Sequence, residues 1–533
     1  MVTAEGEALQ DAQRTHNPAC YLEMSTCVHA RTVVPGGQAI NLWRLGMAGE
    51  EHGSTLTTRA TDATFPQYNF TQPLDHFSNT GFTFSQRYWV SDRYYTPGGP
   101  VIILDSGESS GTERLPYLDT GIVDILANAT GGLGIVLEHR YYGASVPVAN
   151  FTTDSLRWLN IEQALADSAN FMANVKFPGI NEDLTAPRTP WIYYGGSYAG
   201  SRSAHMRVLY PELVYGAIAS SGVTYATILD WQYYDIIRQF GPTDCIHQIQ
   251  TTVYEVDELL SDAKSHTPIK ALFGLANLTH DQDFVSLLAG PLGDWQDKNW
   301  DPAVNSDDFA NFCTALGSPN DTSVEIAKGI SVNAATINYA IYVNQTFSRR
   351  CPSGSTADDC FGTFDPTQYQ ATDLSQTWRL WQFQVCTQFG FFFTAPPDPN
   401  QPRVISKLLT LDYAKMICEF AYPPGQHFTV PALPNITAVN SIGGLNIAAD
   451  RLAIVDGQED PWRPNTPHSD IAKKRLDTPL RPFKLISGAV HHYDENGLSN
   501  RTAEPPVIQE IHSQEVQFVQ AWLSDFKQSK SGL

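Results

Sequence analysis

Six short apolar runs, separated by stretches with helical periodicity, limit most strongly what this chain can fold into. Apolar runs of this length between turn residues predict buried strands of a parallel sheet, and the stretch 161–175 is typical of the helices that connect such strands. This alternation predicts an α/β fold with a doubly wound sheet. The six predicted strands cover residues 99–105, 132–138, 190–194, 215–221, 448–456 and 481–487, and an alternating stretch at 81–90 predicts one more.

The unequal spacing of the runs predicts an insertion. Four of them lie between residues 99 and 221, and the next begins only at residue 448. A single crossover needs far less chain than this gap contains. We therefore expect a largely helical cap over the carboxyl edge of the sheet, where α/β folds place ligands. The expected division is a poorly ordered leader (1–62), a first α/β part (63–225), the cap (226–430) and a second α/β part (431–533).

The cysteines are concentrated in the same gap. No two of the eight cysteines form a C-x-x-C pair, which argues against a zinc ribbon or a thioredoxin-like redox site. An even number confined to one region predicts disulfides that hold the cap together. The six cysteines concerned are Cys245, Cys313, Cys351, Cys360, Cys386 and Cys418, while Cys20 and Cys27 in the leader are not assigned.

Charge and composition exclude several classes of partner. The formal net charge is −22 and the pI is near 4.9, which is the wrong sign for binding nucleic acid or an anionic membrane. No stretch has the ~20 apolar residues of a transmembrane helix. We predict neither metal nor cofactor, and leave a homodimer open.

Glycosylation sequons point to a secreted or vacuolar (lysosomal) protein, although no signal peptide is visible in the first 60 residues. The N-x-S/T motifs are more numerous than composition alone predicts. They begin at Asn69, Asn128, Asn150, Asn277, Asn320, Asn344, Asn435 and Asn500.

Two serines lie on glycine turns, Ser109 in GESSG and Ser197 in YYGGSYAG. A nucleophile elbow needs a strand that runs directly into the turn and a helix that leaves it. Ser197 has both, since the run 190–194 precedes it and a helical stretch follows. Ser109 precedes a stretch broken by Pro116, which is a poor start for a helix. We therefore predict that Ser197 is a nucleophile. Ala199 replaces the usual glycine and is expected to add one tolerated methyl group at the contact between helix and strand.

The GESSG loop has a second use in this prediction. It follows the strand 99–105, where hydrolases of this kind place one half of an oxyanion hole. We expect backbone donors near Gly107 and Glu108, paired with the backbone N–H of Tyr198.

A serine nucleophile of this type needs an acid and a histidine later in the chain, in that order. The run 448–456 is followed by GQEDPW, which offers Asp456 or Asp460. The run 481–487 is followed by GAVHHYD, which offers His491 or His492. Each candidate lies just past a strand, at the edge where Ser197 is expected.

From about Phe70 onward the chain resembles the prolyl carboxypeptidase and dipeptidyl peptidase II family of serine peptidases (peptidase family S28), which includes thymus-specific serine protease and secreted fungal members. The motifs that carry the resemblance are FTQPLDHF (70–77), FSQRYWV (84–90), EHRYYGASVP (138–147), EQALAD (162–167), GGSYAG (195–200), GQEDPW (457–462) and GAVHHYD (488–494).

The resemblance implies the α/β-hydrolase fold with a helical, disulfide-bearing cap, and cleavage of peptides after proline, often at acidic pH. It selects Asp460, which precedes Pro-Trp, and His491, the first of the histidine pair. Together with proximity in sequence, it also implies the pairs Cys245–Cys313, Cys351–Cys360 and Cys386–Cys418.

The cap contributes the candidate substrate-binding residues. Aromatic side chains between 378 and 393 are expected to line an apolar, proline-sized pocket together with Trp462. The candidates are Trp378, Trp381, Phe391 and Gln388, the last of which stands where relatives tend to carry Glu. Glu138, His139 and Arg140 are interpreted as buried scaffold groups.

The sequence thus predicts a serine exopeptidase that acts on proline-containing peptides. It leaves open whether the enzyme is a carboxypeptidase or a dipeptidyl peptidase. An esterase or lipase, and an inactive binding protein on the same fold, remain the alternatives.

Overall fold

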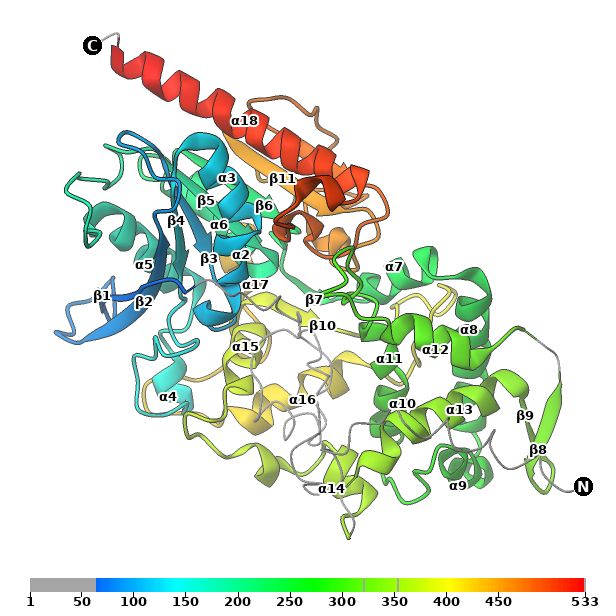
Figure 1. Ribbon diagram of the computed structural model, residues 1–533. Helices are drawn as coiled ribbons and strands as arrows, with labels where there is room; N and C mark the ends of the chain where they lie inside the picture. Colours follow the sequence, from blue (N-terminus) through cyan, green and yellow to red (C-terminus); the bar gives the residue numbers. More distant parts are fainter. Residues whose placement is uncertain (1–63, 320–321, 352–353, 532–533) are drawn as a thin grey trace, which may run out of the picture. The chain divides into compact units, whose positions relative to one another are not determined.

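The computed structural model describes residues 64–319, 322–351 and 354–531. The predicted leader, with Cys20 and Cys27, and the sequon at Asn320 lie outside these ranges. An eight-stranded sheet forms the centre of the described chain (Figure 1). Its strands are β1 (Gln67–Pro73), β2 (Thr83–Ser91), β3 (Val101–Asp105), β4 (Leu133–Leu137), β5 (Trp191–Gly196), β6 (Gly216–Ser220), β11 (Leu452–Gly457) and β12 (Phe483–Ile486).

The strand order is β1-β2-β4-β3-β5-β6-β11-β12, with β2 antiparallel to both of its neighbours and the remaining pairs parallel. This is the α/β-hydrolase arrangement, so the predicted fold class is confirmed. All seven predicted strands are present. The edge strand β1 was not predicted, because QYNFTQP is mostly polar and gives no apolar run.

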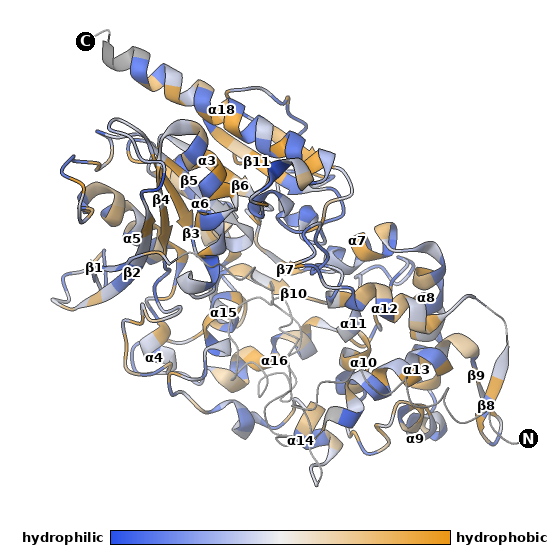
Figure 2. Cartoon of the chain, viewed as in Figure 1, coloured by the Kyte–Doolittle hydropathy of each residue, from blue (hydrophilic) through white to orange (hydrophobic). Residues whose placement is uncertain are grey.

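Helices cover both faces of the sheet. On one face α3 (Ile122–Thr130) packs against α18 (Pro506–Ser531), and on the other α5 (Ile161–Asn174) packs against α6 (Ser197–Leu209) (Figure 1). The central strands are buried along their whole length, and they form the hydrophobic centre in Figure 2. Two short helices, α2 (Pro116–Asp119) and α4 (Thr153–Leu156), lie in the loops between strands.

A large insertion separates β6 from β11, as the spacing predicted, and it is mainly helical. It also holds two small sheets, one of β7 (Thr227–Leu229) with β10 (Gly390–Phe392) and one of β8 (Ser323–Ala327) with β9 (Ile330–Asn333). The proposed boundaries at 226 and 430 stay predictions. Its helices are α7 (Gln232–Phe240), α8 (Thr243–Leu259), α9 (Ala263–Leu272), α10 (Asp281–Leu288), α11 (Gly290–Gly293), α12 (Asp308–Leu316), α13 (Ala334–Thr346), α14 (Ala357–Phe361), α15 (Trp378–Gln384), the π-helix η6 (Val385–Phe389) and α16 (Leu411–Ala421), followed by α17 (Ile436–Asn440).

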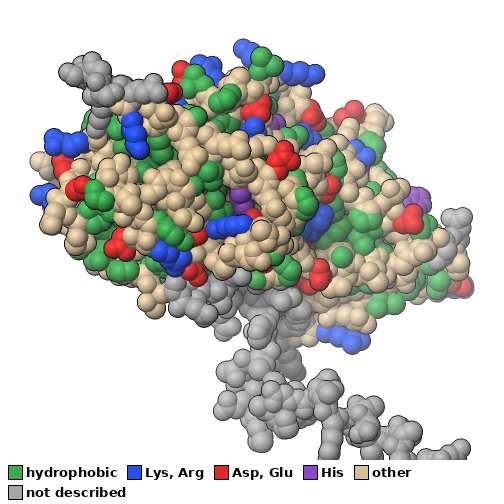
Figure 3. Space-filling view, turned by 45° about the horizontal axis from the view of Figure 1, so that its top comes forward, with side chains coloured by type: hydrophobic (Ala, Val, Ile, Leu, Met, Phe, Trp, Pro, Cys, Tyr) green, Lys and Arg blue, Asp and Glu red, His purple; other side chains and the backbone are tan. Residues whose placement is uncertain are grey.

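Three disulfides lie within the insertion, and they confirm the predicted pairs. Cys245–Cys313 joins α8 to α12, Cys386–Cys418 joins η6 to α16, and Cys351–Cys360 joins α14 to the segment before it. Within the described ranges, the helices are too short or too polar to cross a membrane. Acidic and basic side chains are interspersed over the face shown in Figure 3.

Candidate active site

The turn between β5 and α6 has the form of a nucleophile elbow. Ser197 is the first residue of α6 and has a positive φ of 58°, which is strained for a non-glycine residue. The turn depends on two glycines. A Cβ atom at Gly195 would lie 2.1 Å from the Ala199 carbonyl oxygen, and one at Gly200 would lie 2.6 Å from the Ser220 carbonyl oxygen.

Ala199 faces a different neighbour from the one we expected. The sequence interpretation placed its methyl group at the contact between helix and strand, but Gly200 makes that contact with β6. The Ala199 methyl group instead faces the GESSG loop, where a Cβ atom added to Gly107 would be 3.2 Å away. The extra methyl is accommodated because Gly107 has no side chain.

The predicted acid and base are in direct contact. His491 Nδ1 lies 2.8 Å from Asp460 Oδ2, and Asp460 Oδ1 accepts a hydrogen bond from the Trp462 backbone N–H at 2.9 Å. Both side chains are almost completely buried. The second ring nitrogen, His491 Nε2, is also buried and has no hydrogen-bond partner among the residues that the structure describes.

The surroundings of Asp460 favour its charged form. Burial by itself raises the pKa of this carboxyl group, but the charge of His491 opposes burial. Hydrogen bonds from His491, from the Trp462 N–H and from the Ser221 hydroxyl add to that opposing effect. The net result is a pKa below the ordinary value for aspartate, so Asp460 stays ionised in mildly acidic solution.

The ends of β5 and β6 hold the histidine loop beside the elbow. Asp494 accepts hydrogen bonds from Tyr194 Oη at 2.7 Å and from Ser220 Oγ at 2.5 Å, and the His492 N–H donates to Ser221 Oγ at 2.9 Å. Tyr194 and Ser220 flank the elbow glycines in the paired strands. Ser221 therefore connects the acid loop and the histidine loop, a role for which the sequence carried no signal.

The two residues that the sequence left as alternatives are engaged elsewhere. Asp456 Oδ2 contacts His468 Nδ1 at 2.6 Å and accepts from Thr466 Oγ1 at 2.7 Å. His492 Nδ1 lies 2.9 Å from Glu495 Oε2. Neither belongs to the Asp460–His491 pair.

Ser109 is not placed as a nucleophile. Its hydroxyl donates to the Ser106 carbonyl at 3.2 Å, and its side chain is buried. The stretch after it, which we expected not to start a helix, forms a 3₁₀ helix (Gly111–Arg114) and the four-residue α2. No continuous helix begins at Ser109, in contrast to Ser197.

The GESSG loop lies against the start of α6, as expected for one half of an oxyanion hole, but one predicted donor needs correction. The Gly107 N–H already donates to Asp105 Oδ1 at 3.0 Å, which leaves Glu108 as the candidate in this loop. Burial raises the pKa of the Glu108 carboxyl group. Tyr198, the second residue of α6, lies where a helix has no internal acceptor for its N–H groups.

His139, interpreted from sequence as scaffold, contacts the residue after the predicted nucleophile. Burial, aided by the charge of Arg202, holds the pKa of His139 well below its ordinary value, so the ring is neutral. Nδ1 lies 2.7 Å from the Arg140 carbonyl and must carry the proton. Nε2 then accepts from Tyr198 Oη at 3.0 Å. The positions of Glu138 and Arg140 in ion pairs with Arg87 and Asp167 agree with a scaffold role.

Aromatic rings form a continuous wall from the elbow to the acid loop. Tyr198 contacts Phe389 at a centroid distance of 5.4 Å, Phe389 contacts Phe391 at 5.9 Å, and Phe391 contacts Trp462 at 5.2 Å. Trp381 joins this group, 5.4 Å from Tyr198.

Trp378 does not join that group. It packs instead with Tyr369 in a separate cluster, so the structure separates it from the other substrate-binding candidates.

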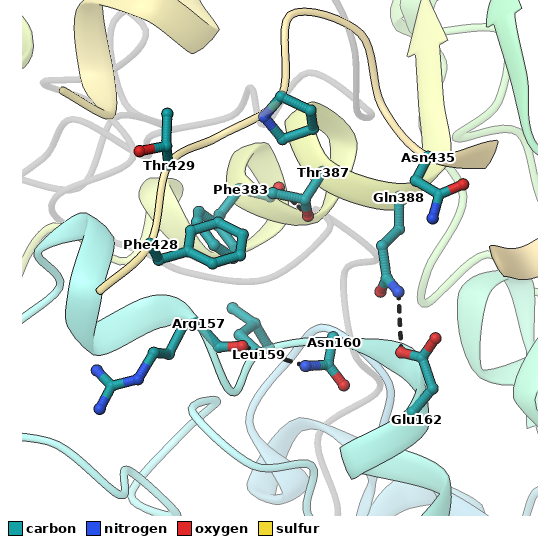
Figure 4. Close-up of a pocket in the computed structure, with 11 residues that line it drawn as sticks. Arg157, Leu159, Asn160, Glu162, Phe383, Thr387, Gln388, Phe428, Thr429 and Asn435 are labelled. Atoms are coloured by element: carbon teal, nitrogen blue, oxygen red, sulfur yellow. Dashed lines mark hydrogen bonds between the residues drawn. The ribbon is translucent and has the colours of Figure 1, made fainter. Parts of the chain in front are cut away.

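Gln388 lies at a pocket between the cap and the start of α5 (Figure 4). Its Oε1 accepts from the Ile161 N–H at 2.9 Å, and its Nε2 donates to Glu162 Oε2 at 2.9 Å. Both ends of the amide are therefore used to join the cap to α5. A glutamate here could keep the first contact but would place its charge against Glu162.

The described sequons differ in how accessible the asparagine is. Asn150 and Asn344 are half-buried, and the Oδ1 of Asn150 accepts from Thr152 and Ser155. The exposed ones are Asn69, Asn128, Asn277, Asn435 and Asn500.

Comparison with known proteins gives consistent matches. The family model "Serine carboxypeptidase S28" matches residues 72–511. A probable extracellular serine carboxypeptidase of Arthroderma benhamiae is 39% identical, with 95% of this chain and 74% of that protein covered. The thymus-specific serine protease of Mus musculus is 27% identical over 86% of this chain and 88% of its own length. The lysosomal Pro-X carboxypeptidase of Pongo abelii is 26% identical, with coverage of 86% and 88%.

Among solved structures, proline iminopeptidase of Mycobacterium smegmatis is 12% identical, with 86% of this chain and all of that chain (100%) covered and a TM-score of 0.37. The family assignment rests on the sequence matches. Because the family model spans most of the chain and includes the elbow, the acid loop and the histidine loop, this chain belongs to the serine carboxypeptidase S28 family of serine peptidases.

Proposed function

We propose that this protein is a serine exopeptidase that hydrolyses the peptide bond after proline through Ser197, His491 and Asp460. The observation that carries the proposal is the buried Asp460–His491 pair. Its Nε2 atom has no partner in the part of the chain that the structure describes, and it belongs to a loop anchored to the strand ends that flank Ser197. The aromatic wall between Tyr198 and Trp462 supports an apolar pocket for a proline ring, which has no donor of its own.

In the proposed mechanism His491 Nε2 removes the proton of Ser197 Oγ as that oxygen attacks the carbonyl carbon of the proline residue. Asp460 holds the ring through Nδ1 and stabilises the imidazolium. The backbone N–H groups of Tyr198 and Glu108 donate to the oxyanion. His491 then protonates the departing amine, and a water molecule activated by the same nitrogen hydrolyses the acyl-enzyme.

Ser197→Ala and Ser109→Ala form a matched pair of variants that tests this proposal. We expect Ser197→Ala to lose both turnover of a proline peptide and labelling by a fluorophosphonate probe, while Ser109→Ala keeps both. A p-nitrophenyl ester series serves as the second substrate. Turnover of esters alone would favour an esterase. Equal behaviour of wild type and Ser197→Ala in both assays would favour an inactive binding protein.

The end of the peptide that is recognised needs its own measurement. Mass spectrometry of one proline-containing peptide, digested with free or blocked termini, separates Pro-Xaa carboxypeptidase from dipeptidyl peptidase action. We also propose that the protein is secreted or vacuolar and glycosylated. The names of its extracellular and lysosomal relatives support this location.

A further inference from the structure

A cavity of about 290 Å³ lies between the cap and the segment that leads into α5. It is at the carboxyl edge of the sheet, because α5 starts at the edge where β4 ends and where Ser197 begins α6. Gln388 lines the cavity, and the next residue, Phe389, contacts the ring of Tyr198. The cavity and the candidate active site therefore both lie where the cap meets the carboxyl edge of the sheet.

One end of the cavity carries a carboxylate. Glu162, in the first turn of α5, is exposed, and one of its oxygens accepts from Gln388 Nε2. The amide of Gln388 cannot turn round, because its Oε1 is required by the Ile161 N–H. Its neutral donor leaves the charge of Glu162 in place, and the second carboxylate oxygen is available to a ligand.

The other polar groups at the cavity do not neutralise this charge. Arg157 donates to the Asp154 carbonyl, lies 3.5 Å from the centre of the Trp158 ring, and points away from Glu162 in Figure 4. Asn160 uses Nδ2 for the Arg157 carbonyl and Oδ1 for a backbone N–H of α5. In the described part of the chain, no lysine, arginine or histidine forms an ion pair with Glu162.

The end of the cavity away from Glu162 is apolar apart from Arg157, which lies beneath Phe428 and points outward in Figure 4. Phe383 and Phe428 contact each other at a centroid distance of 5.7 Å, and Leu159 and Pro431 also line the cavity. A ligand that matches both ends has an apolar group joined to a single positive charge, since an anion would face Glu162 and a neutral polar group would leave its charge uncompensated.

We propose that this cavity binds a primary ammonium group carried on an apolar group, with the charge at Glu162 and the apolar part against Phe383 and Phe428. In a peptide, the ammonium group comes from the N-terminus or from a lysine side chain. Only the identification of the ligand as a segment of the substrate rests on the proposed function.

Direct binding tests the site without turnover. We would titrate the full chain carrying Ser197→Ala and Thr437→Ala with 2-phenylethylamine and with 2-phenylethanol, followed by ligand-observed NMR. Thr437→Ala removes the sequon at Asn435, which lines the cavity. We expect the amine to bind about 3- to 10-fold more tightly than the alcohol, and the preference to weaken with added salt.

Three further variants decide the result. Glu162→Gln should make the two ligands bind equally, and Thr429→Trp, at an exposed position on the rim, should abolish both. Glu510→Gln is the matched control, because Glu510 is also an exposed glutamate that accepts from a glutamine amide, Gln514 Nε2. The Glu510→Gln variant should still bind the amine more tightly than the alcohol. The proposal would be overturned if the amine and the alcohol bound equally to the protein that keeps Glu162. It would also be overturned if the preference for the amine survived Glu162→Gln.

Peptides distinguish the two sources of the ammonium group. An acetylated proline peptide with lysine is compared with the same peptide carrying norleucine, and the norleucine peptide is also used with a free N-terminus. Binding that depends on Glu162 should be observed for the peptide with lysine or for the peptide with a free N-terminus. If neither group strengthens the binding through Glu162, the proposal is wrong. If wild type fails to cleave these peptides while amine binding still depends on Glu162, the proposed function fails and the cavity proposal stands.

Discussion

Two aspartate–histidine pairs have their aspartates four residues apart in sequence, at the end of β11. His468 is partly buried, whereas His491 is almost completely buried. In Asp456–His468 and in Asp460–His491 the Nδ1 atom contacts a carboxylate oxygen, at 2.6 Å and 2.8 Å respectively. They differ in what surrounds the rest of the ring. The His468 ring stacks on Phe483 at 3.7 Å, whereas the His491 Nε2 is buried without a partner within the described ranges.

If the second pair is catalytic, as we propose, an aspartate–histidine hydrogen bond at the end of β11 is not by itself sufficient for catalysis. The first pair joins β11 to the loop that follows it, through Thr466 and His468. The second belongs to loops that Ser221 and Asp494 attach to the strand ends beside Ser197. We infer that the position of Nε2 relative to the elbow separates the two roles.

The largest effect is expected from exchanging each aspartate for asparagine. Asp460→Asn should lower kcat/KM on a proline peptide by about 10⁴-fold, because the histidine loses the partner that selects its tautomer. The kcat/KM of Asp456→Asn on the same peptide should stay within about 3-fold of the wild-type value, once the rate is corrected for the fraction of folded protein. Comparable losses in both variants would remove the distinction between the pairs.

Replacing each histidine by alanine should separate an effect on stability from an effect on activity. His468→Ala leaves the buried Asp456 with one partner fewer, so we expect the free energy of unfolding to fall by about 2 kcal/mol while activity is kept. His491→Ala should abolish activity. Urea denaturation and steady-state kinetics on both variants check this, and inactive but well-folded His468→Ala protein would contradict it.

Tyr198→Phe tests the elbow without touching either pair. It removes the hydroxyl that donates to His139 Nε2 but keeps the backbone N–H that we propose as an oxyanion donor. We expect kcat to fall about 10-fold with little change in KM, because the donor is less well held. A loss of thermal stability with unchanged kcat would show that the contact is only structural.

The smallest expected effect is on thermal stability, and it concerns the carboxyl group of Asp230, which contacts Asn465 in the loop that follows β11. Burial raises the pKa of Asp230 to about 7, although a hydrogen bond from Asn465, 2.9 Å away, opposes the rise. An acid with a raised folded-state pKa stabilises the fold below about pH 4 and loses that contribution as the pH rises through about 7.

Wild type should therefore lose stability between pH 5 and pH 8, and Asp230→Asn should lose less of it. We expect a difference of about 2 °C in Tm at pH 8 and almost none near pH 4. Differential scanning calorimetry at several pH values measures this. A parallel loss in both proteins would show that other groups control the pH dependence.

Much of the fold was predictable from sequence, because buried strands and connecting helices leave strong local patterns. The run 190–194 followed by GGSYAG specifies a strand, a turn and a helix within a few residues, and these elements are present. Strand β1 was missed because it is mostly polar, and it finds its place through pairing with β2 and through contacts of Phe70 and Gln72 with α5. The disulfide pairs were reached with the help of the family resemblance.

The candidate site was only partly predictable. Ser197, Asp460 and His491 each follow a strand, so their common edge was expected. Ser221 and His139 contribute through contacts with residues distant in the chain, and no local pattern announces such contacts. Gly107 was predicted as a donor, but its N–H is taken by Asp105, which depends on the exact path of the loop.

The sequence by itself determined the order of strands and helices, the position of the insertion and the family, because each is written in periodicity and short motifs. Tertiary structure alone decided which residues share a surface. It separated Trp378 from Trp381 and placed Gln388 against Glu162. It also stacked His468 on Phe483, and it left His491 Nε2 without a partner among the described residues. The physical reason is that such contacts depend on the packing of the whole chain, in which residues far apart in sequence become neighbours.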